Sequence, residues 1–178
     1  MGALIADVLD FSRGHLGSGI SVQREPTSEL GAVINSVIDE VRVSHPHVSL
    51  IRNVSIGCET YCDLGRVGQL LSNLLVNAIT HGCSKSPIQV TVTTECNELV
   101  LSVTNQGEPI EPELLPSLFR PFTRSETRGR GEGLGLGLYI AEQIVAGHEG
   151  TLSVSSTAEA GTTFVARWPI AQLAVLAE

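Results

Sequence analysis

The sequence predicts a two-layer α/β fold, in which three helices cover one face of a mixed, mostly antiparallel, five-stranded sheet. Three observations predict it. Apolar residues recur at helical spacing in three segments, strand-like alternation occupies the segments between and after them, and two of the strands lie close enough to form a hairpin. The length of 178 residues, with 42% hydrophobic and 17% charged residues, predicts one main core and excludes a disordered chain.

The N-terminal third carries two helical patterns of different kinds. Residues 1–20 hold a short apolar stripe that glycines interrupt, so we expect this segment to be the end of a longer helix. Residues 30–41 form the first helix of the domain, with Ser28 as the expected N-cap. A strand is predicted over residues 48–54, and a second short extended piece is expected to reach Tyr61.

The central helix has the strongest pattern in the chain. Asp63 is expected to cap its start and Gly82 to end it. Alternating runs predict the four remaining strands, at residues 88–94, 99–104, 151–155 and 162–168. Between them, residues 105–132 contain only a short helical piece at 112–118, and such a long irregular segment is typical of a lid. The third helix is expected over residues 134–145.

Composition excludes several classes of function. A net charge of −8 opposes broad contact with a phosphate backbone, so we expect no nucleic-acid partner. Four cysteines without a CxxC pair predict reduced thiols, a cytoplasmic location and no zinc site. Because no apolar run approaches the length of a membrane span, we expect no membrane contact by this part of the protein.

Two asparagines mark the polar face of the central helix. Asn73 and Asn77 lie one turn apart and point away from the apolar stripe. Asparagine is a poor helix former, so two of them in mid-helix need a reason. They are either part of an ordinary solvated face or a pair of neutral oxygen ligands for a hard cation such as Mg²⁺ and its phosphates.

Two further motifs contain glycine. Asn105 and Gly107 follow the hairpin, where a side-chain oxygen can accept from an exocyclic amine and a glycine admits a flat ring; the same pattern also suits a plain turn. Alternate glycines over residues 131–137 directly precede a helix, so their N–H groups can face phosphate oxygens. A flexible hinge would also explain these glycines, but not the leucines between them. The segment is neither a dinucleotide GxGxxG nor a Walker loop.

Taken together, these motifs resemble the catalytic ATP-binding domain of bacterial sensor histidine kinases, in the superfamily that includes gyrase, a large heat-shock chaperone and mismatch-repair ATPases. The resemblance covers residues 27–169 and implies the Bergerat-type ATP-binding fold. The matching segments are QLLSNLLVNA at residues 69–78, VTNQGEPI at 103–110, LFRPF at 118–122, GLGLGL at 133–138 and GTTF at 161–164.

The resemblance implies a role for each matching residue. Asn77 would hold Mg²⁺ and Asn73 would contact metal or phosphate, which makes these two the expected catalytic residues. His81 would stack on adenine and Asn105 would bond its amino group. The other expected ATP-binding residues are Gly107, Phe119, Phe122, Arg124, Gly133, Leu134, Gly135, Leu136, Gly137 and Thr162.

Three positions depart from the family pattern: Asn105, Thr80, and Pro109, which stands where the family has a second glycine. The family usually has an aspartate where this chain has Asn105, and an uncharged acceptor is expected to lower affinity. Thr80 stands where a lysine often touches phosphate. Four arginines in the predicted lid can supply that charge, or form a solvated basic face: Arg120, Arg124, Arg128 and Arg130.

The amide at Asn73 also separates two chemistries within the superfamily. Hydrolytic members place a glutamate there to activate water, and an amide cannot accept that proton. The resemblance therefore implies transfer of the γ-phosphate to a histidine, and onward to a response regulator. The five histidines of this chain all lack the expected neighbourhood of an acceptor, so we expect the acceptor in a hairpin domain outside it.

This reasoning predicts three parts. Residues 1–26 would be the remnant of the second hairpin helix with its linker, 27–170 the ATP-binding domain, and 171–178 a tail. Such a fragment is expected to be a monomer or a weak dimer without self-phosphorylation. Two alternatives remain: a serine/threonine kinase of the anti-sigma type on the same fold, and a decayed nucleotide-binding interaction module.

Overall fold

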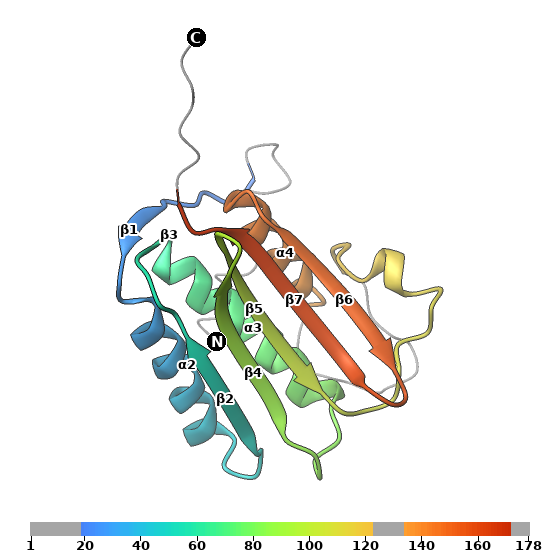
Figure 1. Cartoon of the computed structure of the whole chain (residues 1–178). Helices are drawn as coiled ribbons and strands as arrows, with labels where there is room; N and C mark the ends of the chain where they lie inside the picture. Colours follow the sequence, from blue (N-terminus) through green and yellow to red (C-terminus); the bar gives the residue numbers. More distant parts are fainter. Residues whose placement is uncertain (1–18, 123–133, 172–178) are drawn as a thin grey trace.

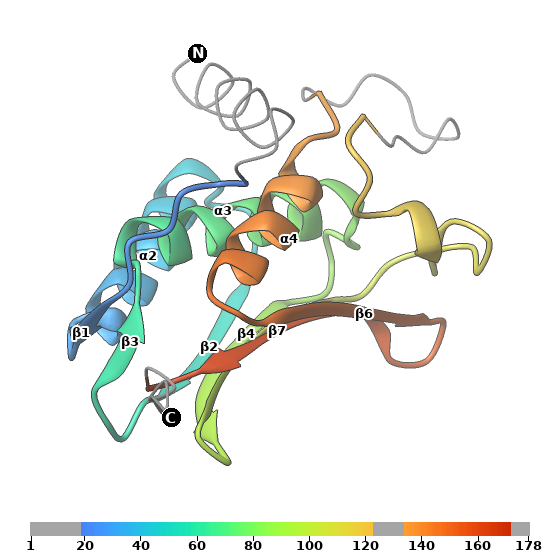
Figure 2. The same ribbon diagram turned by 90° about the horizontal axis from the view of Figure 1, so that it is seen from above.

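The computed structural model describes residues 19–122 and 134–171. Within them, three helices lie on one face of a five-stranded sheet, as Figure 1 shows face-on and Figure 2 from above. The helices are α2 (Leu30–Ser44), α3 (Leu64–His81) and α4 (Gly137–Gly147). The predicted two-layer α/β sandwich is therefore confirmed.

The sheet has the order β2-β4-β5-β7-β6. Its strands are β2 (Leu50–Ser55), β4 (Ile88–Glu95), β5 (Glu98–Asn105), β6 (Thr151–Thr157) and β7 (Gly161–Pro169). Strands β2 and β4 are parallel, and the other neighbours are antiparallel, so the predicted mixed sheet is confirmed. Cys96 and Asn97 both have positive φ between β4 and β5, which is the conformation of a two-residue hairpin turn.

A second, two-stranded sheet was not predicted. Its strands β1 (Glu25–Thr27) and β3 (Thr60–Cys62) are antiparallel. No strand was expected at β1, because three residues around a proline carry no strand signal, although an edge strand tolerates proline. The predicted boundary after residue 26 falls inside β1, and Ile20 is already buried in the core.

The core lies between the helices and the sheet. From the helical side α3 contributes six fully buried residues: Val67, Leu70, Leu71, Leu74, Leu75 and Ala78. Phe164 and Trp168 face them from β7. Burying each of the larger side chains contributes roughly 1.5–3 kcal/mol, so the apolar face of α3 fixes the helix on the sheet. The polar face of α3 does not take part in this packing.

The helix ends confirm one predicted cap and correct two details. Asp63 caps α3 by accepting from the Arg66 N–H, and Gly82 follows its last residue. Ser28 does not cap α2; the N-cap is Glu29, whose own N–H donates to the Thr27 hydroxyl. Helix α4 begins at Gly137 and not at residue 134, because the positive φ of Gly135 is incompatible with a helix.

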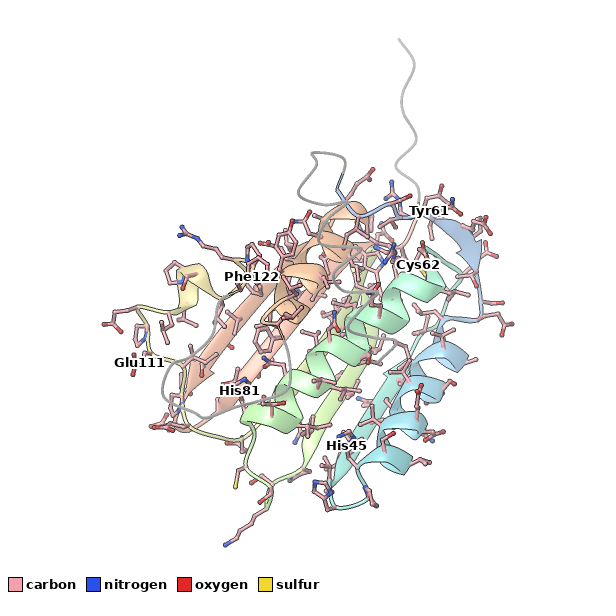
Figure 3. All side chains as sticks on the ribbon, turned by 180° about the vertical axis from the view of Figure 1, so that it is seen from behind. His45, Tyr61, Cys62, His81, Glu111 and Phe122 are labelled. Atoms are coloured by element: carbon pink, nitrogen blue, oxygen red, sulfur yellow. The ribbon has the colours of Figure 1, made fainter. Side chains whose placement is uncertain are left out.

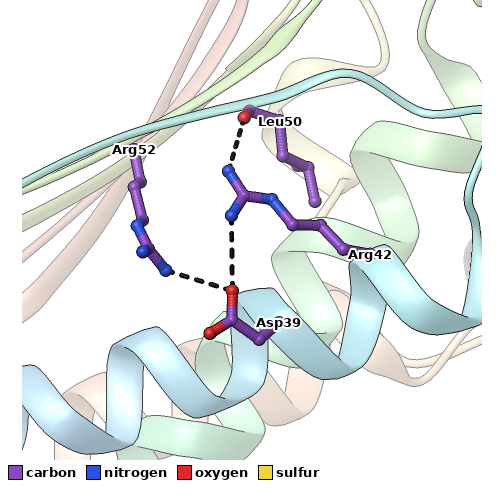
Figure 4. Close-up of polar contacts among 4 residues, drawn as sticks. All are labelled: Asp39, Arg42, Leu50 and Arg52. Atoms are coloured by element: carbon purple, nitrogen blue, oxygen red, sulfur yellow. Dashed lines mark hydrogen bonds and ion pairs between the residues drawn. The ribbon is translucent and has the colours of Figure 1, made fainter.

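Two smaller features complete the fold. The short helix expected at 112–118 is a single 3₁₀ turn, η2 (Leu115–Ser117). Asp39 on α2 accepts from both Arg42 and Arg52, and Arg42 also donates to the Leu50 carbonyl, which ties α2 to β2 (Figure 4). Within the described residues, no helix has both the length and the apolar character needed to cross a membrane.

Candidate functional site

The two predicted asparagines lie on α3 beside the first residue of α4. Asn73 and Asn77 are both half-buried. The Asn73 amide donates to the Gly137 carbonyl at 3.2 Å. Since the opposite face of α3 is packed in the core, both amides lie on its polar side, and Asn73 is the one shown to contact the start of α4. The structure thus brings together two of the three motifs that the sequence indicated.

The glycine segment makes a turn before α4. Gly135 has φ of +70°, and Leu136 is 2% exposed, so this leucine anchors the turn in the core. Leu134, by contrast, is 36% exposed. The Gly135 carbonyl accepts from the Phe122 N–H at 3.1 Å, which attaches the end of the preceding segment to the same turn. Of the two leucines in this turn, Leu136 is therefore a core anchor and Leu134 is not.

Asn105 is buried in crowded surroundings at the end of β5. It is 4% exposed, and its amide donates to the Gln106 carbonyl over a long distance of 3.5 Å. Gly82 and Gly107 form a bridge next to it. A Cβ added to Gly107 would lie 2.6 Å from the His81 carbonyl, so glycine is required there. Sequence reasoning took Gly82 only as a helix end and missed that it borders Asn105.

Thr162 pairs with Asn105 across β5 and β7. It is 6% exposed, and its hydroxyl lies 2.7 Å from that of Ser156, which accepts from the Ile110 N–H. This chain of polar contacts fixes the beginning of the irregular segment, at Ile110, against β6 and β7. Ser156 was missed because a serine in an alternating strand gives no signal of its own.

The aromatic residues predicted around the site have different surroundings. Phe119 packs edge-on against Phe164 with ring centroids 6.4 Å apart, whereas Phe122 is 56% exposed and has positive φ. Figure 3, which views the helical side, shows exposed His81 at the C-terminal end of α3 and Phe122 on the segment between η2 and α4. The predicted Arg124 and Gly133 lie outside the described residues, as do the other arginines of the predicted lid except Arg120.

The amide oxygens of the candidate site suit a hard cation, and the uncharged Asn105 side chain suits a neutral nucleobase. The oxygen donors on the polar face of α3 are amides, which serve Mg²⁺ when phosphate oxygens and water complete its coordination. Burial raises the pKa of the Glu142 carboxyl on α4 and of the Cys62 thiol.

Comparison with known proteins places this geometry in a family. Residues 62–172 match the family described as histidine kinase-, DNA gyrase B-, and HSP90-like ATPase. The chain belongs to this family. A bacteriophytochrome of Pseudomonas aeruginosa is 31% identical over 97% of this chain and 24% of its own length. The sensor histidine kinase TrcS of Mycobacterium tuberculosis is 35% identical over 96% of this chain and 34% of its own length.

These relatives confirm the resemblance to the catalytic ATP-binding domain of sensor histidine kinases. The chain spans only about a quarter to a third of the length of these relatives, which are 24% and 34% covered. The solved full-length structure of ShkA in complex with AMPPNP has a TM-score of 0.79 at 24% identity, over 97% of this chain and 36% of that one. This similarity confirms the predicted Bergerat-type fold.

Proposed function

We propose that this domain binds ATP with Mg²⁺ on the polar face of α3 and donates the γ-phosphate to a histidine in another domain of the parent kinase. The observation that carries the proposal is the hydrogen bond from Asn73 to the Gly137 carbonyl. This hydrogen bond joins α3, which carries the two amides, to the glycine turn. The amides that would bind the metal and the backbone N–H groups that would bind phosphate would therefore be neighbours. Membership of the ATPase family supports the use of ATP.

Each predicted residue then has a task. Asn77 would hold Mg²⁺, with Asn73 beside it, and the ion would neutralise charge on the phosphates. Asn105, buried next to Gly82 and Gly107, would accept from the adenine amine through its side-chain oxygen. Thr162 lies across the strands from it. The backbone of the turn at Gly135 would face the phosphates, with Gly133 and Arg124 completing the contacts.

The chemistry is transfer and not hydrolysis. An imidazole nitrogen attacks the γ-phosphorus, the bond to the bridging oxygen of the β-phosphate breaks, and ADP leaves with that electron pair. Positioning and charge neutralisation by the protein suffice for this step. An attacking water would need a base, and the amide of Asn73 cannot take its proton.

Partners follow from the same proposal. The acceptor histidine would come from a hairpin domain and pass its phosphate to a response regulator in the cytoplasm. Without that hairpin we expect this domain to be a monomer or a weak dimer. The alternative of an anti-sigma-type kinase is less favoured, because the relatives above include a named sensor histidine kinase.

Calorimetric titration with a non-hydrolysable ATP analogue and Mg²⁺ tests the binding step. The wild-type chain should bind, and Asn77→Ala should weaken binding by at least about tenfold, since a metal ligand is lost. Asn53→Ala, on the exposed face of edge strand β2, is the matched control and should bind as wild type does. Absence of binding by the wild-type chain would instead support the decayed module.

A second experiment tests the transfer step. Radiolabelled ATP is incubated with the wild-type chain alone and with a separately made histidine hairpin of a related kinase. Label should appear on the hairpin and be acid-labile, as phosphohistidine is, and not on this chain. Stable label on a serine or threonine would favour the anti-sigma-type alternative.

A further inference from the structure

A second polar cluster lies at the opposite end of α4 from the glycine turn. Its centre is His148, the C-cap of α4, which is 1% exposed. The Nδ1 atom lies 2.8 Å from the Ile144 carbonyl, and Nε2 accepts from the Asp63 N–H at 3.0 Å. A carbonyl can only accept and a backbone N–H can only donate. Both contacts are therefore satisfied only by a neutral ring with its proton on Nδ1.

The surroundings of His148 favour this neutral state. Burial is the main cause that lowers the pKa of His148, and its ring packs against Trp168 with centroids 5.3 Å apart. The charged groups that face it are the Asp63 carboxylate at the start of α3, Arg24 before β1 and Glu149 after α4. The Asp63 and Arg24 charges act in opposite directions on the ring, so they leave burial as the dominant cause.

Helix α4 is thus held to α3 at both of its ends. At its first residue the Gly137 carbonyl accepts from Asn73, and at its C-cap His148 accepts from Asp63. The two helices run side by side on the same face of the sheet (Figure 2). A helix fixed at two points along its neighbour cannot slide or rotate. The contact at Asp63 therefore helps to determine where the glycine turn meets the two asparagines.

The segment before β1 is attached to the same cluster. The Asp63 carboxylate, besides capping α3, accepts from the Gln23 N–H at 2.9 Å. Arg24 donates to the His148 carbonyl at 3.4 Å and pairs with Glu149 at 2.6 Å. A displacement of this segment would act first on Asp63 and His148, and through them on α3 and α4.

We propose that neutral His148 is a positioning residue for nucleotide binding, which fixes α4 along α3 and links that register to Gln23 and Arg24. This inference rests on the proposed function. Protonation of the ring would turn Nε2 into a donor facing the Asp63 N–H, and the contact would be lost. Nucleotide affinity should then fall as the ring takes up a proton, although no atom of His148 touches the nucleotide.

Two variants of similar size separate the hydrogen bond from packing. His148→Gln places an amide oxygen where it can accept from the Asp63 N–H and does not titrate, whereas His148→Leu fills the space without an acceptor. His47→Gln, at an exposed histidine in the turn before β2, is the matched control. Affinity for a non-hydrolysable ATP analogue with Mg²⁺ is measured at about pH 7.5 and about pH 4.5, because burial moves the titration of this ring below the usual range of histidine.

At the higher pH, His148→Leu should bind about tenfold more weakly than wild type, and His148→Gln should recover most of this loss. At the lower pH the wild-type chain and His47→Gln should both bind the nucleotide more weakly than His148→Gln does. Because position 148 does not titrate in His148→Gln, any loss of affinity in that variant measures the other effects of pH. Equal pH profiles for wild type and His148→Gln would overturn the proposal, and this comparison needs no folded leucine variant.

A readout without nucleotide separates this inference from the proposed function. Amide hydrogen exchange at Ile140, which donates to the Leu136 carbonyl in the first turn of α4, is followed in the same variants. Faster exchange in wild type at low pH than in His148→Gln, after correction for intrinsic rates, would support the positioning role even if no nucleotide binds. Identical protection in the two chains would contradict it.

Discussion

At the residue scale, the packing around Asn105 depends on the absence of side chains at its neighbours Gly82 and Gly107. A Cβ on Gly107 would meet the His81 carbonyl at 2.6 Å, and that atom belongs to the backbone. Backbone cannot rotate away as a flexible side chain would, so any larger residue must push the end of α3 and the strand apart. A larger residue at position 107 would therefore change both the stability of the domain and the packing around Asn105, because it would collide with the His81 carbonyl oxygen.

Gly107→Ala is expected to lower the free energy of unfolding by about 1–3 kcal/mol, as overpacking does. Gly31→Ala is the matched control, because a Cβ there meets nothing within 4 Å on α2, and it should raise stability slightly. Urea unfolding midpoints measure both. Equal effects of the two substitutions would show that the close approach at Gly107 is relaxed without cost.

A substitution at Asn105 itself tests adenine recognition. Asn105→Asp should bind an ATP analogue up to about tenfold more tightly, since an ionised acceptor makes a stronger hydrogen bond with the adenine amine. The corresponding inosine nucleotide lacks that amine, so its affinity should not rise. A gain for both nucleotides, or for neither, would remove Asn105 from base recognition.

At the scale of the elements, α3 carries the site on one face and the core on the other. Its start is fixed by Asp63, whose two carboxylate oxygens accept from Arg66 and Gln23 and whose N–H donates to His148. Its end is fixed by Gly82, which lies close to Asn105. The helix is therefore positioned at both termini by polar contacts, and in between by apolar packing.

Asp63→Ala should destabilise the domain by about 1–2 kcal/mol, because the helix cap is lost. Asp63→Asn, which keeps an acceptor oxygen, should recover most of this loss. Thermal unfolding of the three chains measures the difference. If alanine and asparagine behaved alike, the cap would not be the source of the effect.

The contact between α2 and β2 should matter much less (Figure 4). Asp39 is 58% exposed and pairs with Arg42 and Arg52, which are 39% and 38% exposed. Exposed ion pairs contribute less than about 1 kcal/mol and are screened by salt. Asp39→Ala should therefore shift the urea midpoint only slightly, and less in high salt. A larger loss would indicate that the Arg42 bond to the Leu50 carbonyl depends on Asp39.

At the scale of the whole molecule, titratable groups at the joint between the N-terminal segment, α3 and α4 make stability depend on pH. The pKa of His148 lies below its ordinary value of 6.5 in the folded chain, mainly through burial. The unfolded chain therefore takes up this proton first as the pH falls. Glu149 acts in the same direction, since its hydrogen bond from Arg24 lowers the pKa of the carboxyl. Burial of Glu142 raises its pKa and opposes them.

The free energy of unfolding should thus be constant with respect to His148 above pH 6.5, and should decrease below it until the folded ring also titrates. Urea midpoints between about pH 5 and pH 8 measure the slope, which His148→Gln should reduce. A wild-type stability that rises on acidification through this range would show that Glu142 dominates.

Much of the fold and the site was predictable because the signals are local. The period of α3 placed Asn73 and Asn77 on one polar face, and the alternation of β4 and β5 gave their hairpin. Local signals failed where a short element is stabilised by a distant partner. Strand β1 exists through pairing with β3, and α4 starts late because Gly135 adopts a positive φ before it.

The sequence by itself determined the three helices and the five strands of the main sheet to within a few residues, the polar face of α3 and the family, because periodicity, glycine and asparagine act within a few residues of the chain. Only the tertiary structure decided which of these features meet. Sheet register puts Thr162 opposite Asn105, and packing of α4 on α3 brings Gly137 to Asn73 and His148 to Asp63. Such contacts join residues far apart in the chain, so they form only when the whole core has packed.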